Sequence, residues 1–290
     1  MKFPFQNVAL IGKHKAPEIA GPLLSLATFL SSRGLNVVVD SLTAEQIASC
    51  PYPPMNLDEM AHAMDLAIVI GGDGTMLNIA RTLSPHQVPL VGVNQGRLGF
   101  LTDLTLENMQ DSMAAMLDGK FVTEQRLLLS ARVLRGDVEV FGGLAFNEVA
   151  VHRNHASSMV EFEVRIDGEY LYNQRADGLI VATPTGSTAY AMSAGGPILH
   201  PSLDVLELVP VCPHTLSNRP IVVKSSSVLE ILMHRTGDIR VRFDSHTNYD
   251  LELHDKIVVT RHPEPACLLH PVGHSYYHTL REKLLWNQTL

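Results

Sequence analysis

The run Gly71-Gly72-Asp73-Gly74-Thr75 places one carboxylate inside a glycine-rich loop. The apolar residues 66–70 before it predict a buried strand, and the apolar spacing of residues 76–83 after it predicts a packed helix. Backbone N–H groups at such a helix N-terminus commonly bind phosphate. Because a carboxylate repels phosphate, we expect Asp73 to accept a hydroxyl proton or to hold a metal ion. The alternative is a tight turn that merely tolerates an aspartate.

The loop does not follow the common nucleotide-binding patterns. The sequence contains no G-x-x-x-x-G-K-[ST] motif, and Gly92, Gly96 and Gly99 have the wrong spacing for G-x-G-x-x-G. By motif, the chain is therefore neither a P-loop NTPase nor an ordinary Rossmann dehydrogenase.

Composition and charge argue against several classes of protein. The 290 residues are 46% hydrophobic and 18% charged, which is typical of a folded chain with room for two domains. The net charge of -8 argues against a nucleic-acid partner, and the sequence shows neither a membrane-length apolar run nor a signal peptide. Three widely spaced cysteines predict reduced, mostly buried thiols in a cytoplasmic protein, and none of the 14 histidines has metal-motif spacing.

The order of apolar runs predicts two domains. In the first third of the chain, short apolar runs alternate with helical patterns, which indicates a parallel sheet covered on both faces. We expect residues 1–104 and a tail at 272–290 to form this α/β domain, with a connecting helix at 105–119. Residues 120–271 contain successive short β-type runs, and Asp167-Gly168 between two of them predicts a tight hairpin. This second domain is predicted to be all-β.

A second polar segment lies in the β-rich region, at residues 183–190. Its sequence, Thr-Pro-Thr-Gly-Ser-Thr-Ala-Tyr, offers hydroxyl and backbone N–H groups that could hold phosphate or ribose oxygens. Asn147 and Glu148 supply an amide and a carboxylate that suit a ribose diol or an adenine amino group. Both segments also have plainer interpretations: a capped helix after a turn, and a turn before a strand.

Taken together, these segments resemble the ATP-NAD kinase family, and most of all its bacterial branch. The blocks Gly71–Thr75, Gly92–Leu101, Asn147-Glu148, Asp177-Gly178 and Thr183–Tyr190 occur in the order that the family has. The glycine loop alone is shared with lipid kinases, whereas the run at 183–190 combined with Asn-Glu is highly specific to the family.

The resemblance implies a reaction and a set of roles. It implies that the γ-phosphoryl group of ATP is transferred to the 2′-hydroxyl group of the adenosine ribose of NAD, giving NADP. Asp73 would be the catalytic base, and Gly71, Gly72 and Thr75 would form the phosphate loop. The implied NAD-binding residues are Asp73, Gly74, Asn147, Glu148, Arg175, Asp177, Thr188, Ala189, Tyr190, Ala191, Met192, Ser193 and His246. His246 stands where the family commonly has glutamine, which leaves its contact open.

The resemblance also implies the surroundings of the reaction. A divalent metal ion, Mg²⁺ above others, would accompany ATP with few dedicated protein ligands. The family has an N-terminal α/β domain and a C-terminal β-sandwich domain, and is typically homo-oligomeric. We therefore expect a homodimer or homotetramer that binds NAD and ATP, with no nucleic acid and no membrane as partner.

Two other functions compete with this interpretation. A lipid kinase could use the same glycine loop, but it should carry a basic or apolar face for the bilayer, and this acidic chain shows none. A non-catalytic NADP(H)-binding sensor could share the fold, although the intact Asp73 argues against it.

Overall fold

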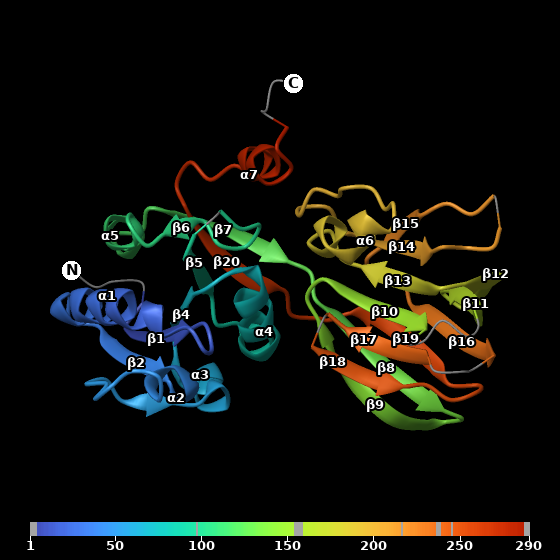
Figure 1. Cartoon of the computed structure of the whole chain (residues 1–290), viewed down its shortest axis with the longest axis horizontal. Coiled ribbons are helices and arrows are strands. Elements are labelled where there is room, and N and C mark those ends of the chain that lie inside the picture. Colours follow the sequence, from blue (N-terminus) through green and yellow to red (C-terminus); the bar gives the residue numbers. More distant parts are fainter. Residues whose placement is uncertain are drawn as a thin grey trace. The chain divides into compact units, whose positions relative to one another are not determined.

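The computed structural model describes residues 5–96, 98–153, 159–215, 217–235, 239–244 and 246–286. The chain divides into two compact units (Figure 1). The first unit comprises Met1–Gln125 and Ala266–Leu290, and the second comprises Arg126–Pro265. Each unit has its own hydrophobic core.

An eight-stranded sheet forms the centre of the first unit. Its strand order is β3-β2-β1-β4-β5-β20-β7, with β6 paired to β5, and the pairings of β1 with β2 and β4, and of β5 with β4, are parallel. The strands are β1 (Asn7–Gly12), β2 (Asn36–Asp40), β3 (Pro54–Met55), β4 (Leu66–Ile70), β5 (Leu90–Asn94), β6 (Leu104–Thr105), β7 (Phe121–Arg126) and β20 (Ala266–Pro271). The α-helices are α1 (Ala20–Ser32), α2 (Ser41–Ala44), α3 (Leu57–Ala63), α4 (Asp73–Leu83), α5 (Met109–Leu117) and α7 (Tyr276–Lys283). Short 3₁₀ turns span Pro17–Ile19 and Ser84–His86.

The local sequence explains where these helices begin and end. Pro17 opens the 3₁₀ turn that leads into α1, and Gly34 follows the helix with a φ of 86°, a left-handed conformation that suits glycine. The apolar faces of α1 and α5 pack in one core with the buried side chains of β1 and β4. The predicted α/β pattern of this unit is confirmed.

The glycine loop follows the carboxyl end of β4, an inner strand of this sheet. β4 ends at Ile70, two glycines follow, and α4 begins at Asp73, as the sequence predicts. β5 runs parallel to β4 and ends at Asn94. In parallel sheets, ligands bind beyond the carboxyl ends of neighbouring strands. The chain segments that leave β4 and β5 are therefore placed to build a site together.

The second unit is a β-sandwich of two six-stranded sheets. The strand orders are β15-β14-β13-β10-β17-β18 and β12-β11-β16-β19-β8-β9, and the assigned pairs in both sheets are antiparallel. The strands are β8 (Leu129–Arg135), β9 (Val138–Ala145), β10 (Glu148–Arg153), β11 (Val160–Ile166), β12 (Glu169–Ala176), β13 (Gly178–Ala182), β14 (Val205–Val211), β15 (Ile221–Lys224), β16 (Leu229–Arg235), β17 (Ile239–Phe243), β18 (Thr247–Asp250) and β19 (Lys256–Arg261). Gly186–Thr188 and Tyr190–Ser193 (α6) form short helical turns. One core contains residues of both sheets, so the predicted fold class is confirmed.

The boundaries of the second unit differ from the predicted ones at both ends: it spans Arg126–Pro265, whereas the sequence predicts residues 120–271. β7 and β20, which the sequence places in the β-rich domain, belong to the sheet of the first unit. β20 pairs in parallel with β5, with Leu268 opposite Leu90. A short apolar run predicts a strand but carries no signal for its distant partner, which explains the error. The sequence also misses β14, whose pattern Glu207 and Pro210 interrupt, and the polar β18.

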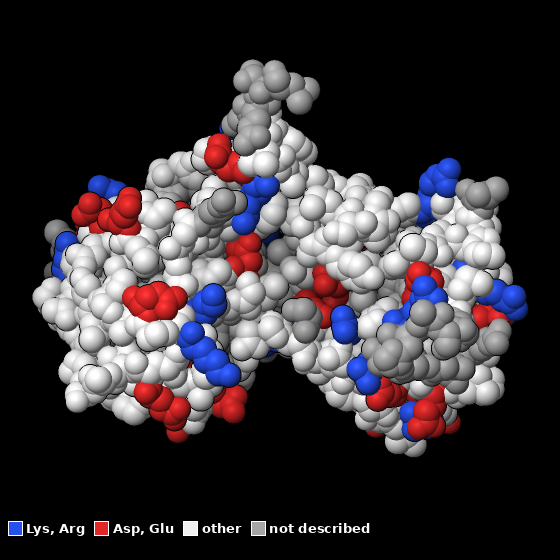
Figure 2. Space-filling view, viewed as in Figure 1, with Lys and Arg blue, Asp and Glu red and all other residues white. Residues whose placement is uncertain are grey.

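The surface charge, the helices and the cysteines add three observations. Acidic and basic side chains are scattered in small groups on the face shown in Figure 2. Within the described residues, no helix combines the length and the apolar character that a membrane span needs. The cysteines are free, but Cys212 is exposed and the other two are half-buried, so the expectation of mostly buried thiols is wrong. Cys212 lies just beyond the end of β14, where the chain turns.

Candidate functional site

The glycine loop presents an open backbone at the start of α4. Gly72 precedes the helix in an extended conformation, and Asp73 is its first residue. A Cβ atom built on Gly72 or Gly74 would meet no atom within 4 Å, so this side of the loop is free of other protein groups. The first N–H groups of a helix have no acceptor within the helix. The loop therefore suits an anion that approaches along the helix axis.

The carboxylate of Asp73 holds the segment that follows β5. Its two oxygens accept hydrogen bonds from the backbone N–H groups of Phe100, at 2.9 Å, and Leu101, at 3.0 Å. The hydroxyl group of Thr102 lies 3.5 Å from the same carboxylate and accepts a hydrogen bond from Asn94. Asp73 is half-buried. Its carboxylate is thus fixed in direction by backbone donors, which the sequence did not predict.

Gly99 is required by this arrangement. A Cβ atom at this position would lie 2.2 Å from Asp73 Oδ1 and 2.2 Å from Thr102 Oγ1. No side chain larger than hydrogen fits there without moving the carboxylate. Arg97, which lies between β5 and Gly99 in the chain, is outside the described residues.

In the second unit, one buried carboxylate gathers the segment around Asn147. Asp244 is 4% exposed and accepts hydrogen bonds from three successive N–H groups, those of Phe146 at 3.0 Å, Asn147 at 2.8 Å and Glu148 at 3.2 Å. The sequence analysis assigned His246 to the site but not Asp244, two residues before it. Asp244 has a φ of 51°, a left-handed conformation that aspartate tolerates.

The loop at residues 183–188 lies directly against the same segment. The N–H group of Thr183 donates a hydrogen bond to the carbonyl oxygen of Asn147, at 2.9 Å. The Thr183 hydroxyl group donates a second one to the carbonyl oxygen of Phe146, at 2.8 Å. A Cβ atom on Gly186 would lie 2.2 Å from the Asn147 carbonyl oxygen. The structure therefore brings together two blocks that lie over 30 residues apart in the sequence.

The buried side chain of Arg126 is hydrogen-bonded to this loop. Arg126 is 1% exposed, and its Nη1 donates to Thr185 Oγ1 at 3.2 Å. Nothing in the sequence around Arg126 indicates this role, because an arginine at the end of a strand is usually a surface residue.

Glu148 has the most unusual electrostatic environment in this part of the site. It is 8% exposed, and its Oε2 has no hydrogen-bond partner among the described residues. Burial, reinforced by the charge of Asp244, raises the pKa of Glu148 to about 8. The carboxyl group is thus protonated at neutral pH and offers an O–H donor as well as an acceptor. Burial also raises the pKa of the nearby Tyr190.

The remaining candidate residues are dispersed over the second unit. Asp177 accepts a hydrogen bond from Arg153 Nη2 at 3.0 Å. Arg175 is bound to Glu161 on the neighbouring strand at 2.9 Å, and 59% of its side chain is exposed. His246 is exposed, and Ser245 beside it lies outside the described residues. The run Thr188–Ser193 forms the end of the 183–188 loop and α6. Among the described residues, no hydrogen bond or ion pair joins Arg175 or His246 to Asn147 or Glu148.

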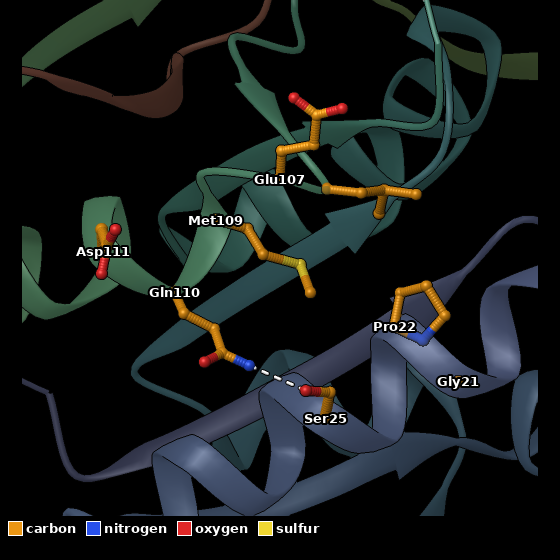
Figure 3. A pocket seen from close by; sticks show the side chains of 8 residues that line it. Gly21, Pro22, Ser25, Glu107, Met109, Gln110 and Asp111 are labelled. Carbon is orange, nitrogen blue, oxygen red and sulfur yellow. Dashed lines mark hydrogen bonds between the residues drawn. The ribbon is translucent and has the colours of Figure 1, made fainter.

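A hollow in the first unit lies apart from these residues. It has a volume of about 450 Å³ and lies between α1 and α5 (Figure 3). Gln110 donates a hydrogen bond to Ser25 across it, at 2.8 Å. None of the residues predicted for the site lines this hollow.

Comparisons with known proteins agree over nearly the whole chain. Residues 8–121 match the ATP-NAD kinase N-terminal domain, and residues 146–270 match the ATP-NAD kinase C-terminal domain. The NAD kinase of Nitrosospira multiformis is 61% identical over 99% of this chain and 98% of that protein. The NAD kinase of Thiobacillus denitrificans is 49% identical over the full length of both chains.

Solved structures show the same likeness. The crystal structure of yeast NADH kinase complexed with NADH has a TM-score of 0.90 and 26% identity, and covers 99% of this chain and 89% of that chain. An NAD kinase from Archaeoglobus fulgidus in complex with ATP has a TM-score of 0.74 and 26% identity, and covers 97% of this chain and 98% of that chain.

The buried state of Glu148 predicts a pH-dependent stability. Its pKa is about 8 in the folded protein against an ordinary value of 4.5, so the folded state binds more protons between these limits. The contribution of Glu148 to stability is then full below about pH 4.5 and falls as pH rises toward about 8. The glutamine side chain of the Glu148→Gln variant cannot ionise. We expect its urea midpoint to rise relative to the parent protein between about pH 5 and 8. The exposed Glu169→Gln is the control, and parallel curves for Glu148→Gln and the parent would contradict the prediction.

Proposed function

Because the chain belongs to the ATP-NAD kinase family, we infer that it transfers the γ-phosphoryl group of ATP to the 2′-hydroxyl group of the adenosine ribose of NAD, giving NADP. It is a phosphotransferase with an alcohol as acceptor. The observation that carries this conclusion is the match of both family domains, together with 49% and 61% identity to curated NAD kinases over almost the entire chain. Production of NADP from ATP and NAD by the purified chain tests it, and a protein that binds these nucleotides without turnover would be a sensor instead.

Asp73 is the catalytic base in this proposal. A ribose hydroxyl group is a weak nucleophile, and phosphoryl transfer depends on its orientation and on the removal of its proton. Asp73 stands beside the open glycine loop, and two backbone N–H groups fix the direction of its carboxylate. A carboxylate oxygen keeps further lone pairs when it accepts one hydrogen bond. It can therefore still accept the proton of a bound hydroxyl group.

The phosphate groups of ATP are bound by the loop of Gly71, Gly72 and Thr75 in this proposal. The open side of Gly72 and Gly74 lets phosphate oxygens reach the backbone. Mg²⁺ would neutralise part of the phosphate charge. The one cluster of potential metal ligands in the described residues does not include the glycine loop, so we assign Mg²⁺ to the ATP phosphates and water.

NAD is held mainly by the second unit in this proposal. Asn147 and the protonated Glu148 offer donors and acceptors that match a ribose diol. Their backbone is fixed by Asp244 and by the loop at residues 183–188, which supports a site prepared before the ligand arrives. The further NAD contacts of the proposal are Gly74, Arg175, Asp177, Thr188, Ala189, Tyr190, Ala191, Met192, Ser193 and His246. Arg175 must exchange its bond to Glu161 if it is to take part.

We also propose that the chain works as a cytoplasmic homodimer or homotetramer. β12 and β15 are edge strands of the two sheets of the sandwich. They expose Tyr170, Leu171 and Val222, at 59%, 39% and 44%. Exposed apolar edge strands favour association between copies.

The first prediction from this proposal concerns Asp73→Asn. Asparagine keeps the shape of the side chain and one oxygen acceptor, but it removes the base. We expect kcat to fall on the order of 10²–10⁴-fold while the affinity for NAD, measured by calorimetry, is retained. Asp58→Asn, in the first turn of α3, is the matched control and should leave kcat unchanged. A near-normal kcat in Asp73→Asn would rule out the role of this residue as the base.

The second prediction concerns Asn147→Ala. Loss of one hydrogen-bonding partner of a buried polar ligand group typically costs about 1–3 kcal/mol, so the KM for NAD should rise roughly 5- to 150-fold. The KM for ATP should change little. Steady-state kinetics with each substrate varied in turn measures both values. Asn173→Ala, on β12, is the control, and an unchanged KM for NAD in Asn147→Ala would remove this residue from the site.

The third prediction concerns assembly. Light scattering at micromolar concentration should report two or four chains per particle. Replacing both Tyr170 and Leu171 with serine should lower the association if the β12 edge carries it. A fully active monomer of the parent protein would contradict the proposal.

A further inference from the structure

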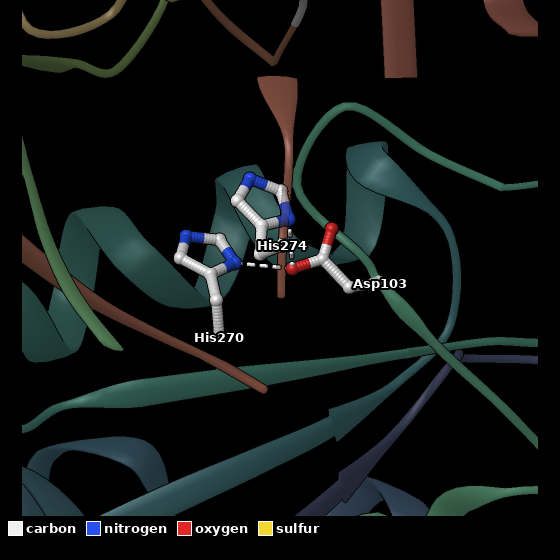
Figure 4. Close-up of side chains that lie close together, drawn as sticks. All are labelled: Asp103, His270 and His274. Atoms are coloured by element: carbon white, nitrogen blue, oxygen red, sulfur yellow. Dashed lines mark hydrogen bonds and ion pairs between the residues drawn. The ribbon is translucent and has the colours of Figure 1, made fainter. Parts of the chain in front are cut away.

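A second polar cluster lies in the first unit, away from the glycine loop in sequence. It contains Asp103, His270 and His274 (Figure 4), and Glu124 of β7 adds a second carboxylate. Asp103 directly precedes β6, His270 is in β20 and His274 precedes α7. The His270 side chain is 2% exposed, and those of Asp103 and Glu124 are 10% and 19% exposed. The cluster thus ties the end of the chain to the segment that follows β5.

Both ring nitrogens of His270 face carboxylates. Nδ1 is hydrogen-bonded to Asp103 Oδ2, and Nε2 to Glu124 Oε2 at 2.9 Å. Burial alone would lower the pKa of His270, but these two partners raise it to about 9. The ring is therefore an imidazolium at neutral pH and donates both protons. His274 stacks on it at 4.1 Å and places its Nδ1 3.2 Å from Asp103 Oδ2.

The cluster adjoins the segment that holds Asp73. The N–H groups that bind the Asp73 carboxylate belong to Phe100 and Leu101, three and two residues before Asp103. Thr102, which touches that carboxylate, is the immediate neighbour of Asp103. The segment is thus bound at one end by Asp73 and at the other by His270.

We propose that His270 is a positioning residue for phosphoryl transfer: bound between Asp103 and Glu124, it fixes residues 100–103 and thereby orients Asp73. This inference rests on the proposed role of Asp73 as the base. The same side chains resemble a metal site, because their ligand atoms lie within 4.8 Å of one another. In the ion-pair arrangement His270 Nδ1 donates directly to Asp103 Oδ2, and in a metal site an ion would bind these atoms instead.

His270→Gln tests the proposal, because glutamine cannot bridge two carboxylates as a cation. We expect kcat to fall roughly 10- to 100-fold, as a small misplacement of a catalytic group does, with both KM values within about twofold of the parent. The exposed His278→Gln in α7 is the control and should behave as the parent. An unchanged kcat in soluble, NAD-binding His270→Gln, or a rise in the KM for NAD alone, would overturn the proposal.

A double-mutant cycle separates positioning from general stability. If His270 acts through Asp73, His270→Gln should change kcat by less than about twofold once Asp73 is replaced with asparagine. An equal loss in both backgrounds would overturn the proposal. Asp103→Asn should reproduce the pattern if His270→Gln fails to fold. Near-normal kcat in Asp73→Asn alone would instead overturn the base assignment, which distinguishes the two failures.

Elemental analysis of the purified full chain completes the test. Protein without bound zinc or another transition metal is the expected result. One such ion per chain, lost in His274→Gln, would overturn the positioning role in favour of a metal centre.

Discussion

Backbone N–H groups must find acceptors when a loop is fixed outside a sheet, and at the candidate site of each unit an aspartate carboxylate supplies them. Asp73 binds two successive N–H groups of the segment after β5, and Asp244 binds three around Asn147. Hydrogen bonds to an ionised acceptor are among the stronger ones in proteins. The segments that carry the candidate site are therefore set by charge, not by regular secondary structure.

Two glycines allow close packing around these segments. Gly99 leaves the space that the Asp73 carboxylate fills, and Gly186 lets the 183–188 loop lie on the carbonyl group of Asn147. Neither glycine has a positive φ, so the backbone conformation does not require glycine at these positions. Glycine is needed because neighbouring atoms occupy the space of a Cβ atom. In the first unit the aspartate and the glycine act together, because the Cβ position of Gly99 lies against the Asp73 carboxylate.

Much of the fold follows from local patterns in the sequence. The strand, glycine loop and helix around Asp73, and the β-rich second unit, were predicted because apolar period and turn residues are local signals. The partner of β20 was not, because pairing between residues 90 and 268 leaves no trace in either run. The candidate site residues were chosen by residue type and motif order. The buried Arg126 and the protonated state of Glu148 were not predicted, because burial depends on contacts distant in sequence.

The position of β20 also affects the order in which the chain can fold during its synthesis. This strand lies between β5 and β7 in the first sheet, yet it is made only after the entire sandwich. A ribosome that has released residues 1–250 has exposed all but the last strand of the second unit, while the first sheet still lacks an inner strand. Domains generally fold as units as they emerge. Here the unit that begins the chain is completed last, and until then the edges of β5 and β7 stay open to wrong partners.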